Sequence, residues 1–278
     1  MQNQIKINAP APGYWRATIS NPPINLIDLD TFVELSELVT RLETERDVKV
    51  IVFESDDPDF FLAHYDVLSD KARSAAMAPG PTGMRPWLDI LVRLSRAPVV
   101  SIASIRGRAR GAGSEFALAC DIRFASAEKA ILGQFEVGVG AVPGGNPMAR
   151  LAGLAGRGRT LEIVLGADDF PGTLAERYGY VNRAVPDTEL DAFVDRFARR
   201  IASFEKEALV ETKRLVDQAS LPGDALFPPA LDAFYRTVAR PATAARIARL
   251  IDAGLQRRSD IETNLGHYVT IRDGDGAG

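Results

Sequence analysis

Residues 99–126, VVSIASIRGRARGAGSEFALACDIRFAS, constrain the fold more than any other part of the chain. The β-branched start, Val99–Ile105, predicts a buried strand that ends at Arg106. Gly107–Gly113 predict a glycine-rich turn, and we expect a helix to start around Ser114. A strand, a tight turn and a helix in this order leave free backbone N–H groups at the positive end of a helix. Such groups can bind an anion or a developing oxyanion.

This glycine-rich turn does not match the common nucleotide-binding loops. A P-loop needs Lys followed by Ser or Thr after its last glycine, whereas Gly113 is followed by Ser114 and Glu115. The dinucleotide fingerprint would need a glycine at Phe116 if Gly111 and Gly113 were its first two glycines. A G-x-S-x-G nucleophile elbow is also absent from this segment. What remains is a carboxylate, Glu115, in the first turn of a helix that directly follows exposed amides.

Short apolar strands alternate with amphipathic helices through the first half of the chain. Tyr14–Ser20 and Val48–Phe53 predict strands, and the apolar spacing after Asp30 predicts a helix with Asp30 as its N-cap. This alternation is typical of an α/β fold. Residues 67–86 are rich in Ser, Ala, Pro and Gly, which predicts a surface loop or short irregular helix, or else a lid to which Trp87 adds apolar surface.

The second half becomes helical near residue 190, and no internal repeat or low-complexity linker marks a sharp boundary. We therefore expect three parts, defined by this change of character and by the Gly- and Asp-rich end. They are a core over residues 1–190, a helical region over 191–270 and a disordered tail over 271–278.

Composition excludes several classes of protein. One Cys excludes a disulfide framework or Cys-rich zinc site, and two His make a histidine metal centre a poor expectation. The net charge of −4 argues against a nucleic-acid binder. No apolar run approaches the about 20 residues of a membrane span, and the polar start is not a signal peptide. These features predict a cytoplasmic protein without metal or redox cofactor, in which Cys120 is a buried small side chain.

Two carboxylates are the candidates for chemistry. Glu115 could act only as a favourable charge at a helix N-terminus. Glu136 lies between Phe135 and Val137 and just before a run of glycines, so it is not expected to be a solvated charge. Either it has a structural partner, or its pKa is raised for proton transfer. Two such acids in one site could divide the roles of acid and base.

Four segments occur in an order that is typical of one family. They are Phe61–Asp66 (FLAHYD, after Arg46–Val52), Gly107–Glu115 (GRARGAGSE), Cys120–Ala125 (CDIRFA) and Leu132–Glu136 (LGQFE). Together they resemble the crotonase, or enoyl-CoA hydratase/isomerase, superfamily over roughly residues 12–220. The resemblance implies an α/β fold built as a crotonase-like spiral of ββα repeats, followed by a helical C-terminal region that forms trimers, either alone or paired into hexamers.

The resemblance also implies a function. The backbone N–H groups of Ala63 and Ala112 would form an oxyanion hole for an acyl-CoA thioester, with coenzyme A present only as part of the substrate. Glu115 and Glu136 match the two family glutamates, which points to hydration of a 2-enoyl-CoA. Isomerisation, C–C bond hydrolysis, thioester hydrolysis and a non-catalytic acyl-CoA-binding role are the alternatives. A pure binding module would need neither glutamate.

The sequence departs from the family pattern at three positions. His64 stands in place of a glycine in the first oxyanion loop, Ala112 replaces a glycine, and Phe135 replaces a proline. His64 could point at the substrate or merely fill space beside it, and we also count Asp66 and Gly111 among candidate substrate-binding residues.

Three arginines alternate around the glycine-rich turn, at Arg106, Arg108 and Arg110. They could form a positive patch for the polyanionic coenzyme A. They could instead face solvent or pair with neighbouring carboxylates, as surface arginines commonly do.

Overall fold

The computed structural model describes residues 3–271. The strands are β1 (Ile5–Ala11), β2 (Tyr14–Ile19), β3 (Val50–Ser55), β4 (Phe60–Leu62), β5 (Val100–Ile105), β6 (Arg108–Arg110), β7 (Ile122–Ser126), β8 (Ile131–Gly133), β9 (Asp169–Pro171) and β10 (Arg183–Val185). The helices of the first two thirds are α1 (Leu29–Thr44), α2 (Lys71–Ala76), α3 (Pro86–Arg96), α4 (Ala112–Ala119), α5 (Glu136–Val139), α6 (Pro147–Gly166) and α7 (Gly172–Tyr178). The remaining helices are α8 (Asp187–Ala202), α9 (Lys206–Ser220), a short 3₁₀ helix (Asp224–Leu226), α10 (Phe227–Val238), α11 (Pro241–Ala253), α12 (Asp260–Thr263) and α13 (Leu265–Tyr268).

The strands form two sheets that are wound by a repeating unit. The larger sheet has the order β1-β2-β3-β5-β7-β10, and the smaller has the order β4-β6-β8-β9. Only the β1–β2 and β8–β9 pairs are antiparallel. The strands β3, β5 and β7 are each followed by a strand of the smaller sheet and then by helices. The chain is thus a spiral of ββα units, as the resemblance to the crotonase superfamily implies.

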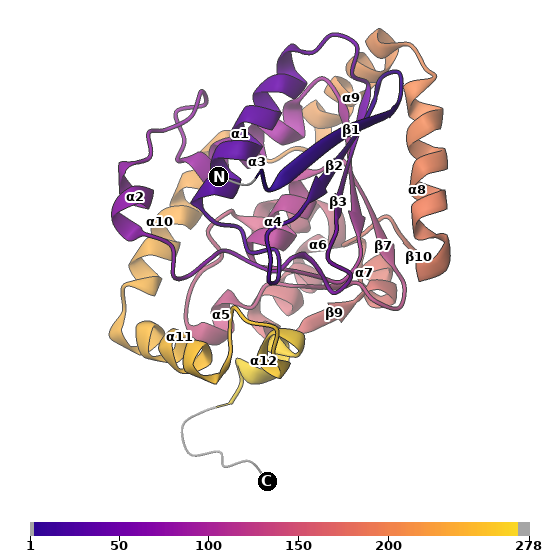
Figure 1. Ribbon diagram of the computed structural model, residues 1–278. Coiled ribbons are helices and arrows are strands. Elements are labelled where there is room, and N and C mark those ends of the chain that lie inside the picture. The colour runs from indigo at the N-terminus through magenta and orange to yellow at the C-terminus, as the bar shows by residue number, and fades with distance from the viewer. Residues whose placement is uncertain (1–2, 272–278) are drawn as a thin grey trace.

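The larger sheet is covered on both faces, which explains the uninterrupted apolar run in β3. Helix α8 lies on one side of the sheet and α1, α3 and α4 lie on the other (Figure 1). Val50 and Val52 pack toward α8, whereas Ile51 and Phe53 pack toward the core that α1, α3 and α4 share. Successive side chains of a strand point to opposite faces, so a strand buried on both faces carries apolar residues at every position. The ring of Phe53 meets that of Phe116 edge-on at 5.0 Å, which fixes α4 against the sheet.

Several predicted elements begin at different residues in the structure. The N-cap of α1 is Asp28 rather than Asp30, because the Asp28 carboxylate accepts the N–H groups of Asp30 and Thr31 at 2.9 and 2.8 Å. Helix α4 begins at Ala112, two residues before the predicted start. The predicted turn before it contains the strand β6, because Arg108 and Ala109 pair with β4 and all three residues of β6 pair with β8.

One helix runs through the point where we expect the helical region to begin. Helix α8 spans the expected boundary between residues 190 and 191, and its Leu190 and Val194 are buried against the larger sheet. The helices α10 to α13 lie beside α5 at one end of the spiral (Figure 1). The short helix α2 lies within residues 67–86, as expected. The tail predicted to be disordered lies outside the described residues, except for Ile271.

Candidate active site

Three of the four predicted motifs meet at one cavity between the spiral and the C-terminal helices, and Cys120–Ala125 lies outside it. Glu115 of α4 and Glu136 of α5 both line it, together with His64 and Tyr65 of the loop that follows β4. Most of the remaining wall is apolar and comes from elements far apart in the sequence. It includes Phe32, Met77, Trp87, Phe135, Leu231 and Phe234. The cavity therefore brings two carboxylates together in surroundings of low polarity.

Glu115 is a buried carboxylate with a donor on each oxygen. The indole Nε1–H of Trp87 donates to Oε2 at 2.7 Å, and the backbone N–H of Gly145 donates to Oε1 at 2.8 Å. Burial raises the pKa of Glu115, and these two hydrogen bonds lower it in part. Because both contacts are N–H donors, they favour the ionised carboxylate.

Glu136 is the first residue of α5 and lies in a different environment. Its Oε2 has no hydrogen-bond partner within the described residues, and its side chain is buried. Burial raises the pKa of Glu136 to about 8, with a further contribution from the nearby charge of Glu115. Because Glu115 has two N–H donors and Glu136 Oε2 has none, Glu115 is the member of the pair that ionises first as pH rises.

Two glycines make room for the two carboxylates. A Cβ on Gly145 would lie 2.3 Å from Glu115 Oε2, and a Cβ on Gly111 would lie 2.8 Å from Glu136 Oε1. Gly111 also has φ of +49°, in the region that favours glycine. Gly111, a candidate substrate-binding residue, therefore has a clear role in admitting Glu136.

The predicted oxyanion donor Ala63 is wrong. Its N–H already donates to Asn25 O at 3.1 Å, and its carbonyl accepts the N–H of Arg110 at 3.1 Å. Both of its backbone groups are thus used by strand-like pairing, and neither is free for a ligand. Ala112, in contrast, is the first residue of α4 and lines the cavity, and its N–H has no acceptor within residues 3–271.

Tyr65 takes the position that Ala63 was expected to fill. The N–H of Ile27 donates to His64 O and the N–H of Asp66 donates to Ile27 O, both at 2.9 Å. In such a parallel bridge the residue between the two bonds directs its own N–H away from the partner strand. That residue is Tyr65, which lines the cavity, and its N–H has no acceptor in the described part of the chain. The sequence carries no signal for this register.

His64 is neither a free ligand nor a mere filler. Its Nδ1 lies 2.8 Å from Tyr65 O and its Nε2 lies 2.9 Å from Oε1 of Glu262, in α12. Burial alone would lower the pKa of His64, but the charge and hydrogen bond of Glu262 outweigh it and raise this pKa. The ring also meets Phe135 edge-on at 5.4 Å, so two of the three departures from the family pattern are in contact.

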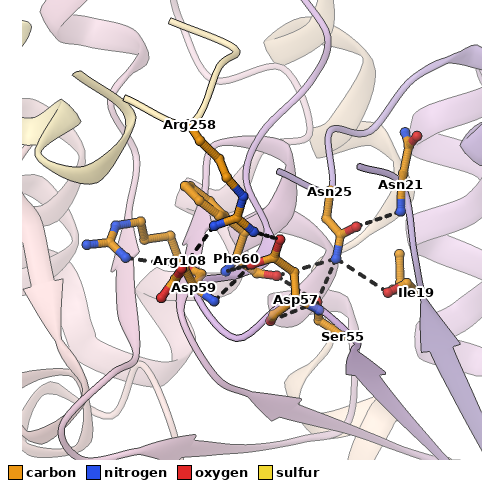
Figure 2. Close-up of polar contacts among 9 residues, drawn as sticks. All are labelled: Ile19, Asn21, Asn25, Ser55, Asp57, Asp59, Phe60, Arg108 and Arg258. Carbon is orange, nitrogen blue, oxygen red and sulfur yellow. Dashed lines mark hydrogen bonds and ion pairs between the residues drawn. The ribbon is translucent and has the colours of Figure 1, made fainter. Parts of the chain in front are cut away.

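Polar contacts hold the segments on both sides of β4, the strand that precedes the loop with His64 and Tyr65. Figure 2 shows Asn25, whose Nδ2 donates to Ser55 Oγ at 2.6 Å, and Arg258, which forms ion pairs with Asp57 and Asp59. Asp66 also belongs to this support, since its carboxylate accepts from the side chain of Gln256 at 2.5 Å and from the N–H of Leu68 at 2.9 Å. Asp66 therefore stabilises the loop.

The three arginines of the glycine-rich turn are paired. Arg106 contacts Asp187 at 2.8 Å, and Arg110 contacts Asp169 at 2.6 Å. Arg108 donates to the carbonyl of Thr263 at 3.0 Å. The pairing with carboxylates is thus confirmed for Arg106 and Arg110, whereas Arg108 bonds to a backbone carbonyl instead.

Three further predictions concern groups away from the cavity. Cys120 is buried, and burial raises the pKa of its thiol, as expected for a small core side chain. Within residues 3–271, no three His, Cys, Asp or Glu side chains are grouped so as to hold a metal ion. Among the same residues, none of the helices is long and apolar enough to cross a membrane.

The fold and the cavity define a class of α/β spiral proteins in which backbone amides and a pair of buried glutamates face one apolar site. Residues 13–239 match the model of the enoyl-CoA hydratase/isomerase family. The chain belongs to this family, which confirms the resemblance seen in its motifs.

Individual relatives support the same assignment. A short-chain-enoyl-CoA hydratase of Clostridium acetobutylicum is 29% identical over 72% of this chain and 76% of its own length. A crotonyl-CoA hydratase of Syntrophomonas wolfei is 33% identical over 65% of this chain and 68% of its own. A crystal structure of a provisionally named enoyl-CoA hydratase from Streptomyces avermitilis is 43% identical, covers 96% of both chains and superposes with a TM-score of 0.91.

Proposed function

We propose that this protein is an enoyl-CoA hydratase, a lyase that adds water across the double bond of a 2-enoyl-CoA thioester. The observation that carries the proposal is the pair of buried glutamates in one cavity, of which Glu115 accepts two N–H donors and Glu136 has a pKa of about 8. The hydratases among its relatives support the same activity. Coenzyme A enters as part of the substrate, and no metal or redox cofactor takes part.

The thioester oxygen would be held by two backbone N–H groups. Those of Tyr65 and Ala112 are without an acceptor in the described chain, and both residues line the cavity. Negative charge develops on this oxygen as water adds, and fixed N–H donors stabilise that charge in a site of low polarity. Ala112 also lies at the N-terminus of α4, where the helix dipole favours an anion.

The two glutamates would then divide the proton transfers. The Glu115 carboxylate takes a proton from water while the hydroxyl oxygen bonds to the β-carbon and the double-bond electrons move toward the thioester. The Glu136 carboxylic acid delivers its proton to the α-carbon, which restores the thioester carbonyl. The result is net addition of H and OH. The site returns to its starting state when a proton passes from Glu115 to Glu136.

The acyl group would occupy the apolar part of the cavity. Its wall includes the rings of Phe32 and Phe234 and the side chains of Met77 and Leu231. These residues provide no charged partner, so they suit an uncharged acyl chain. Hydrophobic burial would then supply most of the discrimination between acyl chains.

A second copy of the chain would cover exposed apolar side chains of α6 and α9. Leu165 of α6 is 61% exposed and Val216 of α9 is 58% exposed. Groups of this kind are commonly buried between subunits. We propose that the assembly is a trimer or a hexamer and that the protein is cytoplasmic. Light scattering of wild type and L165E would measure the assembly.

The test is a panel of 2-enoyl-CoA thioesters followed by the loss of the conjugated chromophore, with products identified by mass. A hydratase gives a product that is 18 Da heavier than the substrate. A product of unchanged mass would indicate isomerisation, and free coenzyme A would indicate thioester hydrolysis. Binding without any turnover across the panel would overturn the proposal.

Two variants test the roles of the acids. E115Q and E136Q preserve shape but remove one ionisable group each, and each should lower turnover by about 10²-fold or more while acyl-CoA binding remains. If either variant retains full activity, that glutamate is not the acid or base.

A further inference from the structure

Trp87 contacts a catalytic group although no predicted motif contains it. It lies in the first turn of α3, an element separated from α4 by β5 and β6 in the sequence. Its indole N–H donates to Glu115 Oε2 at 2.7 Å, and both residues are buried. An indole has a single N–H and can only donate, so Trp87 is the donor and the Glu115 carboxylate is the acceptor of this bond.

The indole ring is held in place from two sides. It stacks on Phe32 of α1, with ring centroids 5.1 Å apart and an interplanar angle of 14°. Pro86, directly before it, is the first residue of α3, where proline fixes the start of a helix. Because the Trp87 ring is already held by Phe32 and by the start of α3, its side chain loses little further conformational entropy when it binds the Glu115 carboxylate.

We propose that Trp87 is a positioning residue for Glu115: its N–H fixes the carboxylate and selects Glu115 as the ionised member of the glutamate pair. This inference rests on the proposed hydration for its kinetic consequences only. The Gly145 N–H already binds Oε1, so Trp87 completes a fixed orientation in which each oxygen has one donor and a lone pair left over. Glu136 has no such donor on Oε2, and the two acids therefore differ in environment.

Other charged groups near Glu115 do not replace this contact. Arg150 of α6 acts on it through charge alone, and its guanidinium bonds instead to Ser95 Oγ at 2.8 Å. His64 lines the same cavity but is paired with Glu262. Arg85 also lines it and donates to Ser74 O at 3.0 Å. Trp87 is thus the side chain that hydrogen-bonds Glu115 within the described residues.

The kinetic test compares W87F with W15F. Phe at position 87 keeps the aromatic ring but removes the N–H. We expect a roughly tenfold lower kcat at pH 7, a KM changed by less than about threefold, and an acid limb of the kcat/KM profile about one pH unit higher, since one donor to the carboxylate is lost. W15F changes the other tryptophan, on β2 and outside the cavity, and should keep the wild-type profile.

A spectroscopic test does not depend on any substrate. In W15F, Trp87 is the sole tryptophan, and its emission should change with pH as Glu115 gains a proton. The transition should vanish in W15F/E115Q and persist in W15F/E136Q, with circular dichroism used to verify folding. If the protein proved not to be a hydratase, this pH dependence of the Trp87 emission would still be expected. A transition that is absent from W15F, or that survives in W15F/E115Q, would overturn the inference, as would W87F with an unmoved acid limb.

Discussion

His64 and Glu262 are 198 residues apart in the chain, yet His64 Nε2 lies 2.9 Å from Glu262 Oε1 in the interior of the protein. The other ring nitrogen faces the carbonyl of Tyr65, so the imidazole meets two acceptors and is protonated when Glu262 is ionised. Glu262 also accepts the N–H of Gln256 at 2.6 Å. The C-terminal segment is thereby joined to the loop that presents the Tyr65 amide.

E262Q should destabilise the protein most at mildly acidic pH. Burial alone would raise the pKa of Glu262, but the charge and hydrogen bond of His64, the N–H of Gln256 and the charge of Arg110 together outweigh it and lower this pKa, while that of His64 is raised. The Glu262 contribution is lost as pH falls through its lowered pKa, and the His64 contribution as pH rises through its raised one. The pair thus stabilises the fold fully between about pH 4.5 and 6.5, the unfolded-state values. Urea unfolding at pH 6 should show a loss of about 3 kcal/mol that becomes smaller at pH 9.

The matched control for E262Q is R258Q. Arg258 also ties the C-terminal segment to the region before β4, but its side chain is 47% exposed. Exposed ion pairs contribute at most about 1 kcal/mol, with little dependence on pH between 6 and 9. Equal losses for the two variants would show that the buried pair has no special role.

Glu136 should make both activity and stability fall as pH rises through about 8. The folded protein binds a proton on Glu136 that the unfolded chain releases near pH 4.5, so stability declines with pH between these values. E136Q cannot ionise and should unfold later than wild type above pH 8, with a difference on the order of a few kcal/mol. Thermal melts across pH 5–10 measure this. A constant offset between the two proteins at every pH would contradict it.

G145A should reduce activity through Glu115. An added Cβ would lie 2.3 Å from Glu115 Oε2, which forces the carboxylate out of its orientation and away from the Gly145 N–H. We expect at least a tenfold loss of kcat. G153A is the control, because a Cβ at Gly153 meets no atom within 4 Å and lies within α6, where alanine is favoured over glycine. A lower kcat in G145A than in G153A, with similar melting temperatures of the two variants, would support the role of Gly145.

The sequence predicted much of this site because the relevant signals are local. Glu115 follows a glycine-rich turn and Glu136 stands between apolar residues, and both patterns can be read within about ten residues. The α/β organisation follows from the alternation of strand and helix signals, and the spiral is what the family resemblance implies. The N-cap of α1 was misplaced by two residues because Asp28 and Asp30 are both suitable acids and only geometry distinguishes them.

The errors concern contacts between distant segments. The family resemblance places a donor at Ala63 from its position in a motif, whereas its pairing with Asn25 and Arg110 depends on register between strands. His64 is explained only by Glu262, in a helix near the other end of the chain. Trp87 lies in a helix whose sequence pattern gives no sign that the indole reaches Glu115. Each of these relationships is tertiary and leaves no periodic signal.

A112P and A112G test the oxyanion hole at one position. Ala112 is the first residue of α4, where proline is well tolerated because the N–H there has no partner in the helix. A112P therefore removes the proposed donor with little cost to the fold, and turnover should fall by about 10²–10³-fold, the usual effect of losing one such donor. A112G retains the N–H and should keep turnover within a few-fold of wild type. Steady-state kinetics and melting temperatures of both variants decide the matter: near-wild-type turnover in folded A112P would falsify the role of the Ala112 amide.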